Sequence, residues 1–470
     1  MKDKNYSLGF TSLEKEIKAD ELKITGKVPG WLCGSLLRTG PAKFETKSQK
    51  ITHWFDGFAM LHRFSFGKGA VSYANKFLHG DFYKESVSTG KISAAGFATD
   101  PCRSIFKRFS SAFFNKPYDN GNVNITRIAD SFLALTETPL PVEFDPKTLE
   151  SLGVFDFRDN INGQLTTAHP HYDSDSKESF NYITRMGKPS HYNLYKIPGG
   201  KTERKLIISI PAEYPSYMHS FAVTKNYIVL AQWPYKINPL RLLLSAKPFI
   251  ENFSWTPKDG TIFIVISKKT SQLVGRYKAP AFFAFHHVNA YEDGNKIVLD
   301  IVSYGDASII KAFYLDVLGG NFGEKYSSSQ ITRFVISLKN KSVDSFVVSD
   351  GSPELPRINY EKFNGKKYNY AYAVGLDRKE FINKLFKINV QNGKKKTWQR
   401  QSCHPGEPVF VQKPGTEAED GGVLLSVVLD SKNKNSFLLV LDAKTLKQIA
   451  TAAVPHHIPF GFHGSYYQQI

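Results

Sequence analysis

The sequence of 470 residues predicts an all-β protein and, within that class, favours a β-propeller. Strand-like runs of β-branched and aromatic residues, bounded by Gly, Asn, Asp and Lys turns, dominate the chain. Long amphipathic helices are scarce, and no Gly/Ser-rich linker divides the chain. We therefore expect residues 1–470 to form a single domain. The clearest runs are YIVLAQW, TIFIVIS, KIVLDIVSY, VLLSVVLD and FLLVLDA.

A weak repeat supports the propeller. A Lys-Thr dipeptide recurs between pairs of strand-like runs, and a histidine follows each of four copies 17 to 22 residues later. In a propeller, equivalent positions of successive blades converge on the axis, although chance also produces so common a dipeptide. A fifth copy, Lys396-Thr397, is followed by Glu407 instead. The four pairs are Lys147-Thr148 with His169, Lys201-Thr202 with His219, Lys269-Thr270 with His286, and Lys444-Thr445 with His463.

The composition is that of a soluble globular protein with a basic balance. Hydrophobic residues make up 41% and charged residues 22% of the chain, and the net charge is +18. This charge attracts polyanions such as nucleic acid or an anionic membrane face, although a solvated lysine-rich surface explains it equally well. No nucleic-acid-binding module is recognisable, so we expect no nucleic-acid partner.

Cysteine usage and the N-terminus indicate a reducing compartment. Cys33, Cys102 and Cys403 are far apart, so neither a disulfide framework nor a cysteine zinc site is expected. The start MKDKNYSLGF has no apolar signal-peptide region, and no run of about 18 apolar residues occurs. We therefore expect a cytoplasmic or membrane-surface protein.

Four histidine-bearing segments end strand-like runs. A lone histidine of this kind is more often a hydrogen-bonded core residue than a ligand, but four in register with a repeat favour a metal site on the axis. Imidazole suits zinc, copper, iron and nickel, so the ligand type alone selects none of them. The segments are TTAHPHYD with His169 and His171, YPSYMHSFAVT with His219, AFFAFHHVNAYED with His286 and His287, and IPFGFHGSYY with His463.

Three glutamates are candidate partners for these histidines. A ligating histidine usually donates its second ring N–H to a carboxylate. Glu137 in LALTETP, Glu354 in GSPELPRINY and Glu407 in HPGEPVF lie in apolar or proline-bearing surroundings. An unpaired carboxylate is costly there, and an imidazole N–H would satisfy it.

The chain resembles the carotenoid cleavage oxygenase family, which includes the retinal-forming carotene oxygenases and the visual-cycle retinoid isomerase. The resemblance runs nearly end to end, and several of the motifs are long and family-specific. They are GKVPGWLCGSLLRTGPAKFE, HWFDGFAMLHRFSF, LALTETPLPVEFDPKTLESLG, TTAHPHYD, YMHSFAVTKNYIV, FHHVNAYEDG, ELPRINYEKFNGKKYNYAYAVG, HPGEPVFV, DGGVLLSVVLD and PFGFHGSYY.

The resemblance implies a seven-bladed β-propeller with a helical and loop cap over one face. It also implies an iron(II) cofactor with O2 as co-substrate, which together cleave a conjugated double bond of a carotenoid or apocarotenoid into two carbonyl products. His171 and His287 are excluded by the motif alignment alone. The implied iron ligands are His169, His219, His286 and His463, and the implied carboxylates behind them are Glu137, Glu354 and Glu407.

Within the family, FHHVNAYED and INYEKFNGKKYNYAYAVG look closer to the animal carotene oxygenases than to plant-type epoxycarotenoid enzymes. This favours central 15,15′ cleavage with retinal as the product. The alternatives are cleavage of a stilbene-like phenolic compound, a retinoid isomerohydrolase reaction without oxygen incorporation, and non-catalytic carotenoid binding. The sequence predicts no particular oligomeric state.

Two segments combine apolar and basic residues, SIFKRFSSAFFN at 104–115 and KINPLRLLLSAKPFIENFSW at 236–255. Both are apolar enough to enter lipid, basic enough to favour anionic headgroups and too short to span a bilayer. Ordinary packing as part of the cap is the alternative. Because the resemblance implies apolar, membrane-facing patches in these regions, we expect a cytoplasmic protein that binds peripherally to an anionic membrane.

Overall fold

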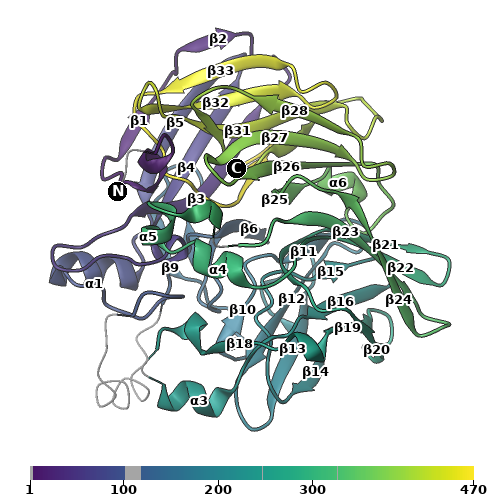
Figure 1. Ribbon diagram of the computed structural model, residues 1–470. Helices are drawn as coiled ribbons and strands as arrows, with labels where there is room; N and C mark the ends of the chain where they lie inside the picture. The colour runs from purple at the N-terminus through teal and green to yellow at the C-terminus, as the bar shows by residue number, and fades with distance from the viewer. Residues whose placement is uncertain (1–3, 101–117, 246, 325) are drawn as a thin grey trace.

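The computed structural model describes residues 4–100, 118–245, 247–324 and 326–470. Seven antiparallel sheets are arranged around a central axis, so the fold is a seven-bladed β-propeller, as predicted (Figure 1). In four of the blades the strands follow chain order from the axis outward. These blades are β6 (Asn124–Ile128), β7 (Ser131–Leu135), β8 (Val142–Phe144) and β9 (Ser151–Val154); β15 (Ala222–Val223), β16 (Tyr227–Gln232), β19 (Thr261–Ser267) and β20 (Leu273–Ala279); β21 (Phe283–Asp293), β22 (Lys296–Tyr304), β23 (Gln330–Ser337) and β24 (Ser342–Ser349); and β25 (Pro353–Arg357), β26 (Tyr370–Asp377), β27 (Phe381–Asn389) and β28 (Lys395–Gln399).

A fifth blade has a divided inner strand, because β10 and β11 both pair with β12. Its strands are β10 (Leu165–Thr166), β11 (His171–Asp173), β12 (Glu178–Arg185), β13 (Ser190–Ile197) and β14 (Lys205–Ala212).

The two remaining blades contain both ends of the chain and close the ring. The last strand of the chain pairs with β3, and two N-terminal strands form the outer edges of both blades. One blade contains β34 (Gly464–Tyr467), β3 (Gly34–Lys43), β4 (Phe58–Gly67), β5 (Ala70–Phe77) and β1 (Ile17–Ala19); the other contains β29 (Cys403–Pro405), β30 (Val409–Gln412), β31 (Gly422–Asp430), β32 (Asn435–Asp442), β33 (Gln448–Val454) and β2 (Ile24–Gly26).

Burial within each blade explains the two kinds of strand sequence. In β22 every residue after Lys296 is buried, because the strand packs against neighbouring blades on both faces. In the outermost strand β20, by contrast, buried Tyr277 and Ala279 alternate with exposed Arg276 and Lys278. Continuous apolar runs are therefore inner strands, and alternating runs are outer strands.

The Lys-Thr repeat is structural at three of its five copies. Lys147-Thr148, Lys269-Thr270 and Lys444-Thr445 form the hairpin turns between the third and fourth strands of their blades, and in each the next residue has a positive φ of 62°, 56° and 60°. In the other two copies the positive φ falls on a glycine, Gly200 or Gly393. Lys201-Thr202 follow Gly200 within the β13–β14 connection, whereas Lys396-Thr397 lie in strand β28. The turn needs one left-handed residue, which glycine supplies without steric cost.

Short helices and loops cover one end of the propeller, as predicted. Because neighbouring strands are antiparallel, the connections between second and third strands emerge at the same end as those between blades. Figure 1 shows α1, α3, α4 and α5 together on one side, whereas α6 (Tyr360–Phe363) lies in a first-to-second connection at the opposite end. The helices of the cap are α1 (Asp81–Thr89), α3 (Pro239–Leu244), α4 (Ser308–Ala312) and α5 (Leu315–Leu318), with 3-10 turns η1 (Ser7–Phe10), η2 (Trp54–Asp56), η3 (Phe249–Asn252), η4 (Pro257–Asp259) and η5 (Phe322–Glu324).

The two apolar-basic segments differ in what the structure describes. Residues 104–115 lie outside the described residues. The segment 236–255 is a hairpin of β17 (Tyr235–Ile237) and β18 (Phe253–Trp255) that carries α3 and η3 between its strands. Ile250 is buried, but Leu240 and Leu244 of α3 are 56% and 73% exposed. In the described part of the chain, no helix is long and apolar enough to cross a membrane.

Candidate metal centre

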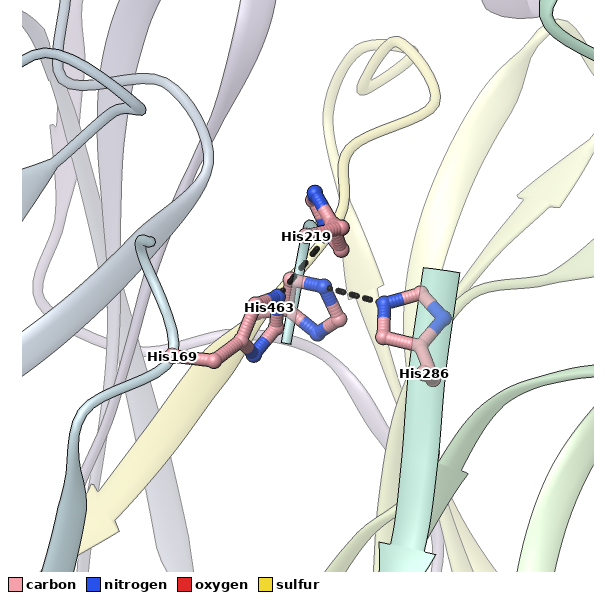
Figure 2. A group of neighbouring side chains, drawn as sticks. All are labelled: His169, His219, His286 and His463. Atoms are coloured by element: carbon pink, nitrogen blue, oxygen red, sulfur yellow. Dashed lines mark hydrogen bonds between the residues drawn. The ribbon is translucent and has the colours of Figure 1, made fainter. Parts of the chain in front are cut away.

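Four histidines converge at the capped end of the propeller axis. Their candidate ligand nitrogens all lie within 4.8 Å of one another. The Nε2 atoms of His169 and His219 are 3.0 Å apart, and those of His286 and His463 are 3.2 Å apart. Figure 2 shows the four rings directed towards one another. The structure thus brings together the four histidines that the sequence analysis selected, from four different blades.

Each of these histidines lies at or just before the innermost strand of its blade. His169 precedes β11, His219 precedes β15, and His463 precedes β34. His286 is inside β21, where the pairing with β22 shifts between Ala284 and His287. This β-bulge releases His286 from the regular alternation, which lets its side chain turn to the axis.

Three of the four imidazoles are oriented by a buried carboxylate. The Nδ1 atoms of His219, His286 and His463 each lie 2.7 Å from a carboxylate oxygen. An N–H donated from Nδ1 leaves the lone pair on Nε2, which faces the other histidines. Three inward lone pairs, together with Nε2 of His169 in the same small space, fit a divalent transition-metal ion. The three pairs are His219 with Glu137, His286 with Glu354, and His463 with Glu407.

Burial lowers the pKa of three of the four imidazoles, those of His169, His219 and His463, and so keeps them neutral and able to bind a cation. Burial, together with the other three histidines, holds the pKa of His169 well below its usual range. Burial lowers the pKa of His463 to about 4, although Glu407 opposes this change. Burial raises the pKa of Glu407, but Arg357, His463 and Arg38 more than compensate and bring it to about 2. Glu407 is therefore a permanent carboxylate beside a neutral imidazole.

The adjacent histidines His171 and His287 do not join the cluster. His171 bonds through Nδ1 to the Tyr360 hydroxyl at 3.0 Å and through Nε2 to the Phe221 carbonyl at 2.9 Å. His287 bonds through Nδ1 to Ser220 Oγ at 2.9 Å, and its ring stacks on Trp233. Both are thus packed residues of the inner strands.

An aromatic cluster, which the sequence analysis did not identify, lies between the histidines and the cap. Phe285 is 5.5 Å from the ring of His219, and Phe55 is 5.8 Å from Phe285. Phe55 also contacts Phe97, Phe313 and Phe462 at 5.2, 5.7 and 5.2 Å between ring centroids. This side of the centre is therefore apolar and suited to a flat conjugated molecule. The HWFDGF motif was the available signal, since it contains Phe55.

A buried carboxylate, Asp56, fixes two of these rings. Its oxygens accept the main-chain N–H groups of Phe97, Ala98 and Thr99 at 2.6, 2.9 and 2.7 Å. A side chain on Gly96 would collide with Asp56, since an added Cβ would lie 2.3 Å from Oδ1. Because Phe55 precedes Asp56 directly, one residue holds both Phe55 and the loop that carries Phe97.

A cavity of about 710 Å³ reaches the histidines from the opposite end of the propeller. His169, His286 and His463 line its inner end. Lys177 and Lys201, which belong to hairpin connections at the uncapped end, line its outer part. The centre thus has an apolar side towards the cap and a polar side along the axis.

Known proteins resemble the whole chain. A family model described as "Retinal pigment epithelial membrane protein" matches residues 10–468. The mitochondrial carotenoid-cleaving dioxygenase of Macaca fascicularis is 36% identical over 97% of this chain and 93% of its own length. The β,β-carotene 15,15′-dioxygenase of Gallus gallus is 35% identical over 96% of both chains. A cobalt-substituted apocarotenoid oxygenase of Synechocystis superposes with a TM-score of 0.87 and 26% identity over 99% of this chain and 98% of its own.

The fold and the site define a class of metal-binding β-propellers. In this class four histidines meet on the axis, and carboxylates accept hydrogen bonds from their outer ring nitrogens. The matches over nearly the whole chain are more specific, and they show that the chain belongs to the carotenoid cleavage oxygenase family. The predicted enzyme class, an O2-dependent dioxygenase, is confirmed with it.

Proposed function

We propose that this chain is a non-haem iron(II) dioxygenase that cleaves one conjugated double bond of a carotenoid or apocarotenoid into two carbonyl products. The observation that carries the proposal is the convergence of four imidazoles, three of them backed by buried carboxylates. His169, His219, His286 and His463 would hold the iron through Nε2. The names of the macaque and chicken relatives support the substrate class and the use of dioxygen.

Iron(II), when bound, supplies the chemistry that activates dioxygen beside the polyene. The side chains of the protein provide the rest of the site. Glu137, Glu354 and Glu407 keep Nδ1 protonated on three histidines, so each presents its Nε2 lone pair. The rings of Phe55 and Phe285 exclude water and lie against the flat face of the polyene.

The net reaction needs no external reductant. One carbon–carbon double bond breaks, and each of its two carbons receives one oxygen atom of O2 as an aldehyde. No general acid–base pair is required, because no proton is gained or lost. The side chains therefore have to position the bond and keep water away.

Within this class we propose central 15,15′ cleavage, which gives retinal. The support is the 35% identity to the chicken enzyme named for that reaction. Because the apolar side of the centre fixes how far a polyene can enter, the shape of the Phe55–Phe97–Phe313 cluster would decide which bond lies near the metal.

The test is an anaerobic iron(II) titration followed by incubation with detergent-solubilised β-carotene and apocarotenals under ¹⁸O₂. Two labelled aldehydes establish the dioxygenase, and retinal as the product of β-carotene establishes central cleavage. Bound iron without cleavage of any polyene would favour a phenolic substrate or the isomerohydrolase reaction. Tight carotenoid binding without turnover would favour a binding protein.

We further propose that the protein is cytoplasmic and binds peripherally to an anionic membrane through α3. The support is the exposure of Leu240 and Leu244 beside exposed Arg241, together with the net charge of +18. An apolar pair next to a cation can enter the interface while the charge contacts headgroups.

Co-sedimentation with phosphatidylserine-containing vesicles tests this contact. Leu240→Ser with Leu244→Ser should release the protein into the supernatant. A matched change of two exposed leucines elsewhere, Leu152→Ser with Leu206→Ser, should leave binding unchanged. Equal binding of both variants would exclude α3 as the contact.

A further inference from the structure

The three carboxylates behind the histidines are not held equally well. The Glu354 carboxylate accepts the Leu355 main-chain N–H at 2.9 Å, and the Glu407 carboxylate accepts that of Gly464 at 2.9 Å. Main-chain donors of this kind stay in place when a side chain is changed. Among the described residues, no main-chain N–H donates to the carboxylate of Glu137.

Glu137 depends instead on one phenol. The Tyr217 hydroxyl donates to both oxygens of its carboxylate, at 2.9 and 3.0 Å. Among the described residues, the other donor to that carboxylate is the imidazole that it orients, His219. Without the phenol, the hydrogen bond with His219 itself is the one described bond that opposes rotation of Glu137 away from this imidazole.

Tyr217 is itself fixed in position. Its ring is buried and contacts Phe97 and Phe253 at 5.6 and 6.0 Å and stacks on Phe283 at 6.3 Å. Its main-chain N–H donates to the Tyr235 carbonyl at 3.0 Å. These contacts involve the ring and the backbone, so they persist when only the hydroxyl is removed.

Tyr304 makes the same kind of phenol–carboxylate hydrogen bond, but the carboxylate that it holds also has a main-chain donor. The Tyr304 hydroxyl donates to Glu354 at 2.6 Å, but Leu355 also holds that carboxylate. Removal of either hydroxyl deletes one oxygen atom and one phenol–carboxylate bond. The two sites differ in whether another donor then keeps the carboxylate in place.

From this difference we infer that Tyr217 is a positioning residue of the metal centre, which acts through Glu137 on His219. The Tyr217 hydroxyl keeps Glu137 against Nδ1 and thereby keeps Nε2 of His219 directed at the other histidines. The inference rests on the proposed metal-binding function and extends it to Tyr217, whose hydroxyl also lies 3.4 Å from Nδ1 of His219.

The test compares Tyr217→Phe with Tyr304→Phe by anaerobic transfer of iron(II) from the protein to a chelator. Loss of an outer partner typically lowers metal affinity about 10- to 100-fold, so we expect iron to leave Tyr217→Phe faster by about that factor. Tyr304→Phe should stay near the wild type. The visible spectrum of the cobalt(II)-loaded protein should change in Tyr217→Phe, because the ligand field reports the orientation of His219.

Tyr368→Phe is the matched control for loss of a buried phenol. The Tyr368 hydroxyl donates to the buried carboxylate of Asp300 at 2.8 Å, with no link to the histidines. Its iron release and cobalt spectrum should match the wild type. If Tyr368→Phe released iron as fast as Tyr217→Phe, general loosening of the core would explain the result and the inference would fail.

A double-mutant cycle keeps the inference testable if Tyr217→Phe also lowers stability. In a Glu137→Ala background the phenol has no carboxylate to hold, so adding Tyr217→Phe should change iron release no further. An additive effect would show that Tyr217 acts by another route. Wild-type protein that binds neither iron nor cobalt would refute the proposed function, whereas unchanged release in Tyr217→Phe would refute this inference alone.

Discussion

His286 and Glu354 are joined by a 2.7 Å hydrogen bond, although they lie in the innermost strands of two neighbouring blades. Each residue borders an irregular stretch of its strand. The pairing of β21 shifts between Ala284 and His287, and that of β25 shifts after Glu354, where Leu355 has a positive φ of 48°. Two departures from regular strand geometry thus meet at one hydrogen bond, as is common at functional sites.

This arrangement predicts opposite outcomes for two adjacent histidines. His286→Ala should abolish stoichiometric iron binding, because it removes an Nε2 donor and leaves Glu354 without its imidazole. His287→Ala should retain one iron per chain, because His287 bonds to Ser220 away from the cluster. Metal analysis after anaerobic loading and gel filtration measures both. Iron loss in His287→Ala with retention in His286→Ala would overturn the assignment.

The arginines beside Glu407 predict that Glu407→Gln lowers the free energy of unfolding more than Glu354→Gln does. Arg357 lies 3.6 Å from the Glu407 carboxylate, and Arg38 is buried nearby. Glu407→Gln leaves these guanidinium groups without their anion, which should lower the free energy of unfolding of the metal-free protein by on the order of 3 kcal/mol. Glu354→Gln should cost less, because no arginine is among its described partners. Urea unfolding measures both, and equal losses would contradict the account.

Much of the fold could be predicted from local sequence. Apolar runs such as that of β22 mark the inner strands, and the Lys147-Thr148, Lys269-Thr270 and Lys444-Thr445 turns mark the outer hairpins. The prediction was wrong at Lys396-Thr397, which lie inside β28 and not in the turn before it. The pairing of β1 and β2 with the edges of two blades was not predicted, since three-residue strands carry too little pattern.

The histidines and glutamates of the metal centre could be predicted from the sequence more readily than the residues that pack around them. His169, His219, His286 and His463 share a position relative to the blades, so a repeat can reveal them. The link from Tyr217 to Glu137 cannot be found in this way, because it joins residues on different blades without a shared register. The contact of Asp56 with Phe97 is likewise a matter of tertiary packing alone.

Buried histidines predict how stability changes with pH. Burial lowers the pKa of His53 and His287 to about 3 and that of His463 to about 4, against 6.5 for each in the unfolded chain. Below pH 6.5 the unfolded chain therefore binds protons that the native protein does not, so stability falls as the pH drops towards 4. Urea unfolding of the metal-free protein at pH 7.5 and 5.0 measures this. A free energy of unfolding that stays constant or rises at pH 5.0 would contradict it.

The contacts of Asp56 predict a large structural cost. Asp56→Ala leaves three main-chain N–H groups without their acceptor, two of them buried, and each buried group costs about 1–3 kcal/mol. The melting temperature should therefore fall strongly. Asp130→Ala is the matched control, because its carboxylate is fully exposed and pairs with Arg127 at the surface. A melting temperature of Asp56→Ala equal to that of the control would show that Asp56 does not hold the Phe97 loop.

The location of the metal is the central claim, and anomalous diffraction at the iron absorption edge tests it most directly. Crystals grown anaerobically with iron(II) should show one strong anomalous peak on the propeller axis, within bonding distance of Nε2 of His169, His219, His286 and His463. A peak beside His171 or His287, or iron-loaded protein with no peak among the four histidines, would contradict the account.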